Sequence, residues 1–297
     1  MTELGIGITN VGPVGINKPG VLHQAQLSER LGADSLHLTD HLLLVENTRS
    51  PYPFTPDGKL ATAPELPRLE SLSTCGWILA GTETIRVGPS VLALTQRNPL
   101  EVAKVVATLD VLSGGRMFLG IGTGWLAEEQ EALGYDFANR NERFEDWIAV
   151  LRYAWSGDTS GLVGEHYSVP EGIYARPTPY EGRTIPLWTG GMTPKARRQS
   201  IAIANGWIAV HRVDDDLEKI TTLTRAVIDG LADASRARAE FQTVVRVVDA
   251  NPQNRHKQVQ LCRELADIGF DEIVIDVAWA ELDGVEKLIS DCREALS

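Results

Sequence analysis

The sequence is poor in cysteine, and this scarcity excludes two kinds of protein. Its 297 residues contain three cysteines, Cys75, Cys262 and Cys292, which are far apart and form no CxxC pair. An odd number of widely spaced cysteines argues against a disulfide framework and against a zinc site. This usage is typical of a reducing compartment, and we expect a cytoplasmic protein with no bound metal.

Positive charge is also scarce. The chain has 28 Lys and Arg residues against 40 Asp and Glu residues, which gives a formal net charge of -12. Such a chain repels nucleic-acid phosphates and anionic lipid surfaces. No stretch approaches the roughly 20 apolar residues that cross a bilayer, and no signal peptide begins the sequence. These absences favour a soluble protein with a small-molecule substrate, no nucleic-acid partner and no membrane contact.

Short apolar runs and helical segments alternate along the whole chain. Eight runs rich in Val, Ile and Leu are candidate strands, and they begin at Leu4, Ser35, Ile85, Arg116, Ile185, Gly206, Phe241 and Glu272. The segments between them, such as 99–115 and 257–270, have helical spacing and charged faces. Eight such units favour an α/β fold, the (β/α)8 TIM barrel, over a doubly wound open sheet. Without a linker or repeat, residues 1–297 are expected to form one domain.

Two connections are too long for ordinary barrel loops. Residues 41–65 follow the second strand, and residues 156–184 precede the fifth. Loops of this length inside a compact domain are usually lids or binding loops. We therefore expect insertions after strand 2 and before strand 5. Aromatic side chains such as Tyr52, Phe54 and Tyr167 either line a pocket over the barrel mouth or pack on its rim.

The stretch LGIGTGWLAEEQEALG, residues 119–134, is rich in glycine but does not match a dinucleotide-binding loop. Gly120, Gly122 and Gly124 form a GxGxG pattern that continues into Trp125, whereas the dinucleotide fingerprint GxGxxG turns directly into a helix. In a barrel these residues lie at the C-terminal end of strand 4. Sites are built there, and glycines let a flat ring approach the backbone.

Three separated motifs resemble those of the luciferase-like monooxygenase superfamily, and in particular of its branch that uses the deazaflavin coenzyme F420. They are LGADSLHLTDHLL, QRNPLEVAKVVATLDVLSGGRMFLGIGTGWLAEEQEALG and IPLWTGGMTPKARRQSIAIANGWIA. The resemblance runs from Leu31 to Val210 and thins toward the C-terminus. It implies a TIM barrel and a homodimer. It also implies an oxidoreductase that transfers a hydride between F420 and an organic substrate.

On this resemblance, the residues after strand 2 belong to the active site. His41 is the catalytic candidate, because an imidazole at the barrel mouth donates or accepts a proton near neutral pH. The preceding Asp40 is expected to bond the cofactor's ring system or to fix His41. Alternatively, His41 satisfies loop carbonyls and Asp40 caps the following loop.

The resemblance also places the cofactor phosphate at the segment WTGGMTPKARR. Exposed amides at a helix N-terminus bind anions, and the lysine and arginines of this segment add positive charge. The alternative is an ordinary strand-to-helix turn. The expected cofactor-binding residues, besides Asp40, are Ser90 and Val91, where the family often has a cis peptide, Thr123, Gly124, Thr189, Gly190, Gly191, Thr193 and Lys195.

Trp125 departs from the pattern of members that oxidise sugar phosphates, which carry a glutamate directly after Gly-Thr-Gly. An indole at this position offers an apolar wall for an aromatic or lipophilic substrate, or packs the loop. Trp188 and His211 are further candidates for the substrate pocket. Arg246 and Asp276 interrupt the apolar strands 7 and 8, and a buried ion pair is the simplest explanation, with substrate contact as the alternative.

Two other functions fit the same motifs. A flavin monooxygenase that uses reduced FMN and oxygen would look nearly the same in sequence. A barrel that keeps a flavin pocket for binding, without turnover, would also retain these motifs. The identity of the bound cofactor separates the first alternative from an F420 enzyme, and loss of catalysis on mutating His41 separates an enzyme from a binding barrel.

Overall fold

The computed structural model describes residues 2–55, 57–60, 62–249 and 254–297. Within them, nine parallel strands follow one another in the order β3-β2-β1-β9-β8-β7-β6-β5-β4. The strands are β1 (Glu3–Ile8), β2 (Ser35–Leu38), β3 (Arg86–Pro89), β4 (Leu92–Ala93), β5 (Leu119–Gly122), β6 (Leu187–Gly190), β7 (Gly206–Arg212), β8 (Gln242–Val248) and β9 (Glu272–Asp276). All eight predicted strand segments are confirmed, the third of them being divided into β3 and β4.

The division of this strand closes the barrel. β3 pairs with β2, β4 pairs with β5, and the Ser90–Val91 peptide between them is cis, as expected. An isolated bridge from Val87 to Met117 also joins β3 to the residues just before β5. The nine strands are therefore an eight-stranded parallel barrel, which confirms the predicted (β/α)8 fold and excludes the open sheet.

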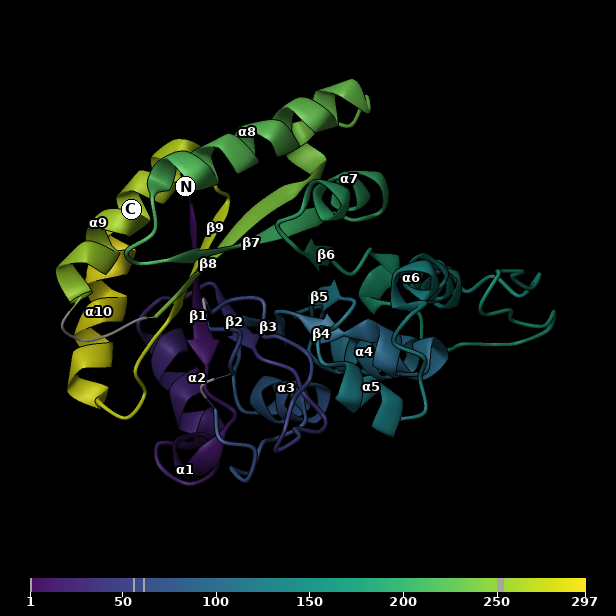
Figure 1. Cartoon of the computed structure of the whole chain (residues 1–297), viewed down its shortest axis with the longest axis horizontal. Coiled ribbons are helices and arrows are strands. Elements are labelled where there is room, and N and C mark those ends of the chain that lie inside the picture. Colours follow the sequence, from purple (N-terminus) through teal and green to yellow (C-terminus); the bar gives the residue numbers. More distant parts are fainter. Residues whose placement is uncertain (1, 56, 61, 250–253) are drawn as a thin grey trace.

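Helices surround the strands on the outside (Figure 1). They are α1 (Gly12–Ile16), α2 (Gly20–Arg30), α3 (Ser71–Ala80), α4 (Pro99–Leu112), α5 (Ala127–Ala132), α6 (Arg140–Ser156), α7 (Pro194–Ile203), α8 (Leu217–Asp233), α9 (Arg255–Ile268) and α10 (Leu282–Ala295), with short 3-10 turns at Leu94–Gln96, Tyr180–Gly182 and Arg238–Glu240. Among these helices, none combines the length and apolar character needed to cross a bilayer.

Helix α4 shows how local signals set the element boundaries. The Asn98 side chain accepts hydrogen bonds from the amides of Leu100 and Glu101, at 3.0 and 3.3 Å, and Pro99 occupies the first turn. Such a cap satisfies amides that have no partner inside the helix. This helix therefore begins where its sequence predicts, and it precedes β5 in the chain.

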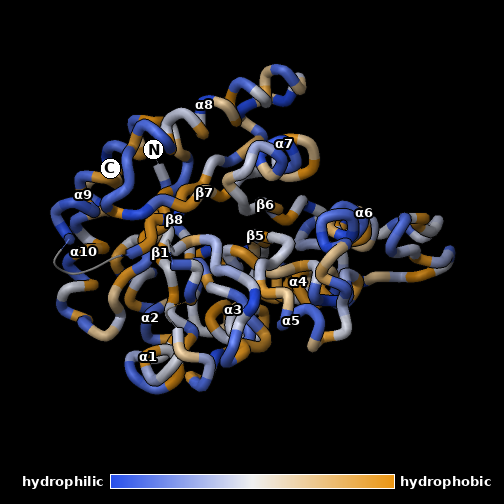
Figure 2. The backbone as a smooth tube through the Cα atoms, in the orientation of Figure 1, coloured by the Kyte–Doolittle hydropathy of each residue, from blue (hydrophilic) through white to orange (hydrophobic). Residues whose placement is uncertain are grey.

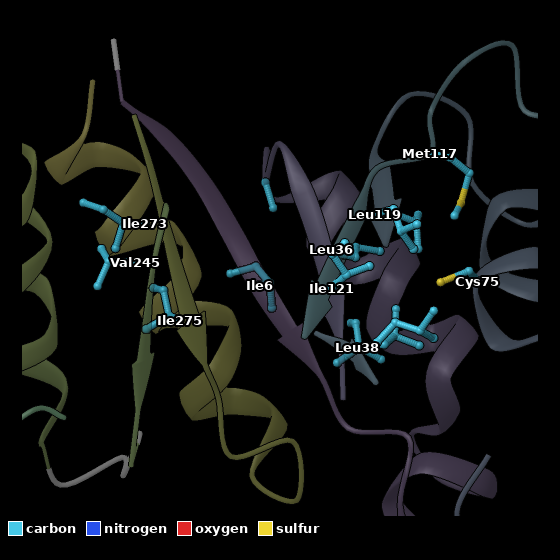
Figure 3. Close-up of a cluster of buried hydrophobic side chains, with 14 of the residues drawn as sticks. Ile6, Leu36, Leu38, Cys75, Met117, Leu119, Ile121, Val245, Ile273 and Ile275 are labelled. Atoms are coloured by element: carbon cyan, nitrogen blue, oxygen red, sulfur yellow. The ribbon is translucent and has the colours of Figure 1, made fainter. Parts of the chain in front are cut away.

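The hydrophobic core has two layers. Leu36 and Leu38 of β2 are fully buried with Leu119 and Ile121 of β5, and Figure 3 shows these side chains gathered beside Cys75 of α3. A separate buried cluster consists of Phe118, Trp188, Ile208, Val244 and Val274. Because neighbouring residues of a strand point to opposite faces, the first set packs on the helices and the second fills the barrel. Figure 2 shows the matching pattern, with hydrophobic central strands and helices of mixed character.

Both predicted insertions are present. The first, residues 41–65 with Pro56 and Ala61 outside the described residues, runs between β2 and α3 without a helix or strand among its described residues. The second was predicted as residues 156–184; Ser156 is the last residue of α6, and residues 157–184 extend away from the barrel beyond that helix (Figure 1). Tyr167 of this insertion packs edge-on against Trp147 at 5.4 Å, which places it on the rim.

Candidate functional site

A cavity of about 400 Å³ opens at the carboxyl ends of the strands. This volume is in the range of small-molecule sites, and the position is where barrel enzymes build their active sites. Of the predicted site residues, the cavity is lined by Asp40, His41, Ser90, Val91, Gly124 and Trp125. Tyr52 and Phe54 of the first insertion line it as well.

His41 is paired with Glu129 of α5. Its Nδ1 atom lies 2.8 Å from Oε2 of Glu129, whose side chain is 2% exposed. Oε1 of the same carboxylate accepts hydrogen bonds from the amides of Leu42 and Leu43, at 2.6 and 3.0 Å. The imidazole is thus held by a buried carboxylate, not by the loop carbonyls that were the alternative.

The protonation of this pair follows from its surroundings. Burial by itself raises the pKa of Glu129, but the hydrogen bond with His41, its charge and the two amides outweigh burial and lower the pKa below its ordinary value. An ionised carboxylate only accepts hydrogen bonds, so Nδ1 of His41 is the donor. In the neutral ring, Nε2 is therefore the atom that is free to accept a proton.

Asp40 lines the cavity, and other residues of the protein hold its carboxylate; its predicted role toward the cofactor or His41 stays a prediction. Its carboxylate receives two hydrogen bonds from Arg97, at 2.7 and 2.8 Å, one from Ser71 Oγ at 2.7 Å and one from the amide of Ala93 at 2.9 Å. The side chain is fully buried. Because four donors already occupy both oxygens, this carboxylate fixes the β2, α3 and β4 ends of the barrel mouth.

Aromatic side chains form one wall of the cavity. The ring of Trp125 lies edge-on to His41, with centroids 5.7 Å apart, and edge-on to Tyr52 at 5.1 Å. Tyr52 in turn contacts Phe54 at 5.5 Å. Edge-to-face pairs of this kind add to the stability that burial provides. Trp125 therefore belongs to an aromatic wall of the cavity, and its predicted role toward a substrate stays a prediction.

Arg246 and Asp276 form the ion pair predicted between strands 7 and 8, which are β8 and β9. Nη2 and Nε of Arg246 lie 2.7 and 2.9 Å from Oδ1 of Asp276. Nη1 of Arg246 donates to the carbonyl of Ser90 at 2.7 Å. Both charged residues line the cavity. The guanidinium therefore fixes the Ser90–Val91 segment from the opposite side of the barrel mouth.

The glycine loop after β6 adjoins the cavity through Val91. A Cβ atom added to Gly190 would lie 3.1 Å from Cγ1 of Val91, which is close contact. Gly191 has φ +131°, a conformation that favours glycine. Thr193 caps α7 by accepting from the amide of Ala196 at 3.2 Å, and Lys195 is exposed on the first turn.

Eight of the predicted residues do not line the cavity: Gly190, Gly191, Thr193 and Lys195 of the loop after β6, and also Trp188, His211, Thr189 and Thr123. Trp188 is fully buried inside the barrel and stacks on Phe118 at 4.6 Å. His211 is 3% exposed on β7, and burial lowers its pKa. The Thr189 hydroxyl bonds Ser200, and the Thr123 carbonyl accepts from Gln130 at 2.7 Å. Their predicted roles in binding stay predictions.

Among the residues of the cavity wall that sequence reasoning missed are the polar side chains of Glu129, Arg68 and Asn10. Glu129 is one of several acidic residues on α5, and the sequence carries no signal that selects it. Arg68 and Asn10 lie in irregular segments, where periodicity gives no information. In the described part of the chain, no group of three or more His, Cys, Asp or Glu residues could hold a metal ion.

Comparisons with known proteins agree with this architecture. The family model of the luciferase-like monooxygenases matches residues 10–258. An F420-dependent glucose-6-phosphate dehydrogenase of Microbacterium testaceum (strain StLB037) is 35% identical over 228 residues, which are 74% of this chain and 61% of that protein. The chain therefore spans less than two thirds of this relative's length.

Solved structures share the fold at low sequence identity. An F420-dependent secondary alcohol dehydrogenase in complex with an F420-acetone adduct superposes with a TM-score of 0.79 at 14% identity, covering 100% of this chain and 99% of that one. The FMN complex of the oxygenating constituent of 3,6-diketocamphane monooxygenase from Pseudomonas putida gives a TM-score of 0.73 at 12% identity, with coverage of 99% and 98%. At such identities the similarity concerns the fold alone.

Proposed function

Because the chain belongs to the luciferase-like monooxygenase family, we propose that it is an oxidoreductase that uses coenzyme F420 to transfer a hydride to or from an organic substrate. The relative from Microbacterium testaceum, an F420-dependent dehydrogenase by name, supports the choice of cofactor. The observation that carries the proposal is the His41–Glu129 pair, which faces the same cavity as Ser90 and Val91.

The cavity residues fit a flat deazaflavin ring. The side chain of Val91 is held in a fixed position, because it packs closely against Gly122 and Gly190, where an added Cβ atom would be in tight contact with it. Ser90 is 8% exposed and its Oγ has no hydrogen-bond partner in the described part of the chain. A buried hydroxyl without a partner is costly, and a polar ring edge would satisfy it. When bound, F420 supplies a ring carbon that carries a hydride and reacts poorly with oxygen.

The first turn of α7 would hold the cofactor's phosphate. Gly190 and Gly191 have no side chains that would cover the backbone, Thr193 caps the helix, and Lys195 adds a positive charge. Helix N-termini attract anions because their first amides have no partner in the helix. Thr123, Thr189 and Gly124 would then support the loops on either side of the ring.

His41 would move the proton that accompanies the hydride. Glu129 keeps Nδ1 protonated, so Nε2 accepts a proton when an alcohol is oxidised and returns it when a ketone is reduced. Trp125 and Tyr52 exclude water from this side of the cavity and favour a lipophilic or aromatic substrate. Trp188 and His211 do not line the cavity and would act on the substrate only through the residues that do.

Parallel titrations with F420 and FMN test the cofactor. Binding is followed by quenching of tryptophan fluorescence, and a Trp125→Phe variant identifies the part of the signal that comes from the cavity. We expect tighter binding of F420. Tighter binding of FMN than of F420 would overturn the F420 proposal in favour of a flavin monooxygenase, and binding of neither would overturn both.

Turnover tests whether the barrel is an enzyme. F420-loaded protein is assayed with ketones, enones, quinones and alcohols, and we expect hydride transfer with members of at least one class. His41→Gln should keep F420 binding and lose turnover. Full turnover in that variant would remove His41 from the chemistry, and binding of F420 without turnover of any substrate would favour a non-catalytic flavin-binding barrel.

We further propose a homodimer, and a cytoplasmic location that the unpaired state of all three cysteines supports. Helices α3 and α4 carry exposed apolar side chains: Trp77 is 63% exposed, Val105 40% and Leu112 79%. Contiguous exposed apolar side chains are typical of interfaces. Sedimentation should show a dimer that Trp77→Glu weakens, while Val163→Glu, on the second insertion, leaves it intact. A monomer in the native protein would refute this.

A further inference from the structure

Arg68 differs from the other charged residues of the cavity in its ion pairing. Asp40 is paired with Arg97, Glu129 with His41, and Asp276 with Arg246. In the described part of the chain, no carboxylate lies within salt-bridge distance of the Arg68 guanidinium, although this side chain lines the cavity. Among the described residues, Arg68 is thus a cation of the cavity wall that makes no ion pair within the protein.

The guanidinium has unused hydrogen-bonding capacity. Nη1 donates to Oγ1 of Thr39 at 3.2 Å, while the buried Nε has no partner in the described part of the chain. Burial lowers the pKa of Arg68, and the more distant Glu129 and Asp40 act in the opposite direction. A partly buried cation with free N–H groups is well suited to bind a carboxylate, which accepts two parallel hydrogen bonds from such a fork.

The backbone that carries Arg68 is held in place. Residue 68 forms an antiparallel bridge with Val11. The Gly12 amide donates to the carbonyl of Pro67 at 2.8 Å, and the Leu69 amide donates to that of Asn10 at 2.9 Å. Asn10 is fully buried, and its Nδ2 bonds the carbonyl of Leu69 at 3.0 Å. The backbone of Arg68 is therefore held in a fixed position, although the residue follows a long insertion.

The topology separates Arg68 from the proposed phosphate site. Arg68 is attached to the residues that follow β1, whereas the glycine loop follows β6. In the closed order of eight barrel strands, with β3 and β4 counted as one, β1 and β6 lie opposite each other. The cation on the β1 side is thus available to an anion other than the cofactor's phosphate.

We propose that Arg68 is the specificity-determining residue of this site, and that it binds the carboxylate of an organic-acid substrate. The substrate would place its carboxylate on Arg68 and its apolar body against Trp125 and Tyr52, with the reacting carbon beside His41. This inference rests on the proposed function, because it assigns the cavity to the substrate. It narrows the substrate class to lipophilic or aromatic acids.

Equilibrium binding tests the inference without turnover. Calorimetry with 3-phenylpropanoate and with its uncharged amide, in the presence and absence of F420, compares two probes of similar shape. We expect the native protein to bind the acid about 10- to 100-fold more tightly than the amide, the range for hydrogen bonds to a charged group. Arg68→Gln should remove this preference, and Arg68→Lys should keep part of it.

The control is Arg49→Gln, which removes an exposed arginine from the insertion that precedes Arg68. Arg49 is paired with Glu131, and this variant should keep the preference. Equal affinity of the native protein for acid and amide would overturn the inference whether or not any variant folds. So would an Arg68→Gln variant that keeps the preference, or one that loses only F420 affinity. A carboxylate preference in a protein that does not bind F420 would uphold the inference and refute the proposed cofactor.

Discussion

Nδ1 of His41 lies 2.8 Å from Oε2 of Glu129, although 88 residues separate them in the chain. The contact joins the end of β2 to α5. The neighbouring Glu128 accepts a hydrogen bond from Oγ of Ser50 at 2.8 Å, which ties the first insertion to the same helix. Helix α5 therefore orients the imidazole and holds the insertion over the barrel mouth.

Replacement of the buried carboxylate should impair catalysis more than binding. In Glu129→Gln the amide no longer requires Nδ1 of His41 to be the donor, so the ring loses its fixed tautomer. Because a single positioning partner typically contributes about 10- to 100-fold, we expect kcat to fall by that factor, with little change in F420 affinity. Steady-state kinetics over pH and fluorescence titration measure the two effects.

Glu131→Gln is the matched control for this variant. Glu131 lies on the same helix, but it is 52% exposed and pairs with the exposed Arg49. We expect its kcat and pH profile to equal those of the native protein. An unchanged kcat in Glu129→Gln would show that His41 needs no partner for its role.

A substitution at Gly191 should affect binding of the cofactor's phosphate but not binding of its ring. A Cβ atom on this residue would lie 2.7 Å from Cβ of Ala196, and φ is +131°. Gly191→Ala should therefore displace the first turn of α7 and weaken F420 binding about 10-fold or more. Affinity for the deazaflavin chromophore without its phosphodiester should remain unchanged, because that ligand does not reach the helix.

Gly182→Ala serves as the control for backbone conformation. Gly182 also has positive φ, at +69°, and nothing lies within 4 Å of its added Cβ. This variant should lose some stability and keep native affinity for both ligands. If Gly191→Ala lowered the affinity for F420 and for the truncated chromophore equally, the phosphate would bind elsewhere.

The sequence predicted the barrel because its strands carry strong local signals. Runs of Val, Ile and Leu mark all eight strand segments, and the cap at Asn98 marks the start of α4. The Arg246–Asp276 pair was predictable as well, since charged residues are rare in apolar strands and these two strands are adjacent. Such features depend on neighbours in sequence or on neighbouring strands.

The rest of the site depends on contacts that the sequence does not encode locally. Glu129 lies among Glu128 and Glu131 on α5, and only the packed position of the helix selects the residue that reaches His41. Arg68 reaches the cavity through a bridge formed after a long irregular insertion. Trp188 was expected in the pocket, but strand register places it in the inner layer of the barrel.

Acid should destabilise the protein through a buried cluster at the amino ends of the strands. Nε2 of His37 lies 2.8 Å from Oε1 of Glu272, and both side chains are fully buried. Burial by itself raises the pKa of Glu272, but the hydrogen bonds from His37 and Ser35 and the charge of Arg86 lower it to about 2. Burial lowers the pKa of His37, although Glu272 opposes this effect.

The sign of the pH dependence follows from these shifts. Both groups bind fewer protons in the folded state than in the unfolded state, so stability rises with pH. The contribution of His37 should begin to fall below its ordinary pKa of 6.5, and that of Glu272 as the pH falls from 4.5 toward 2. Thermal unfolding at pH 7, 5.5, 4.5 and 3.5 should show Tm falling throughout.

Glu272→Gln should lower Tm at pH 7 and flatten this dependence, because its side chain no longer titrates. Glu3→Gln is the control, since Glu3 contacts the same Arg86 at 2.6 Å but burial raises its pKa, which gives the opposite sign. Because Glu3 opposes the acid effect, that variant should keep the loss of stability in acid or make it steeper. A Glu272→Gln variant as sensitive to acid as the native protein would assign the effect to other carboxylates.

The Arg246–Asp276 pair should matter for both stability and cofactor binding. Arg246→Met removes the ion-pair partner of Asp276, whose side chain is 31% exposed. It also removes the hydrogen-bond donor to the Ser90 carbonyl. Breaking a buried pair costs about 3–5 kcal/mol, and partial exposure of Asp276 reduces this to about 2–3 kcal/mol. Urea unfolding measures the loss, and F420 titration should show weaker binding, because the ring wall at Ser90 and Val91 is no longer fixed.

An arginine-to-methionine substitution in an exposed ion pair is the control, because it removes one positive charge without changing the cavity. Arg212 lies 2.5 Å from Asp249, and the two side chains are 39% and 48% exposed. Solvent screens such a pair, so Arg212→Met should cost less than about 1 kcal/mol and leave F420 affinity unchanged. If Arg246→Met lost stability but kept native F420 affinity, the ion pair would support the barrel without shaping the ring wall, and Ser90 and Val91 would be held by the strand alone.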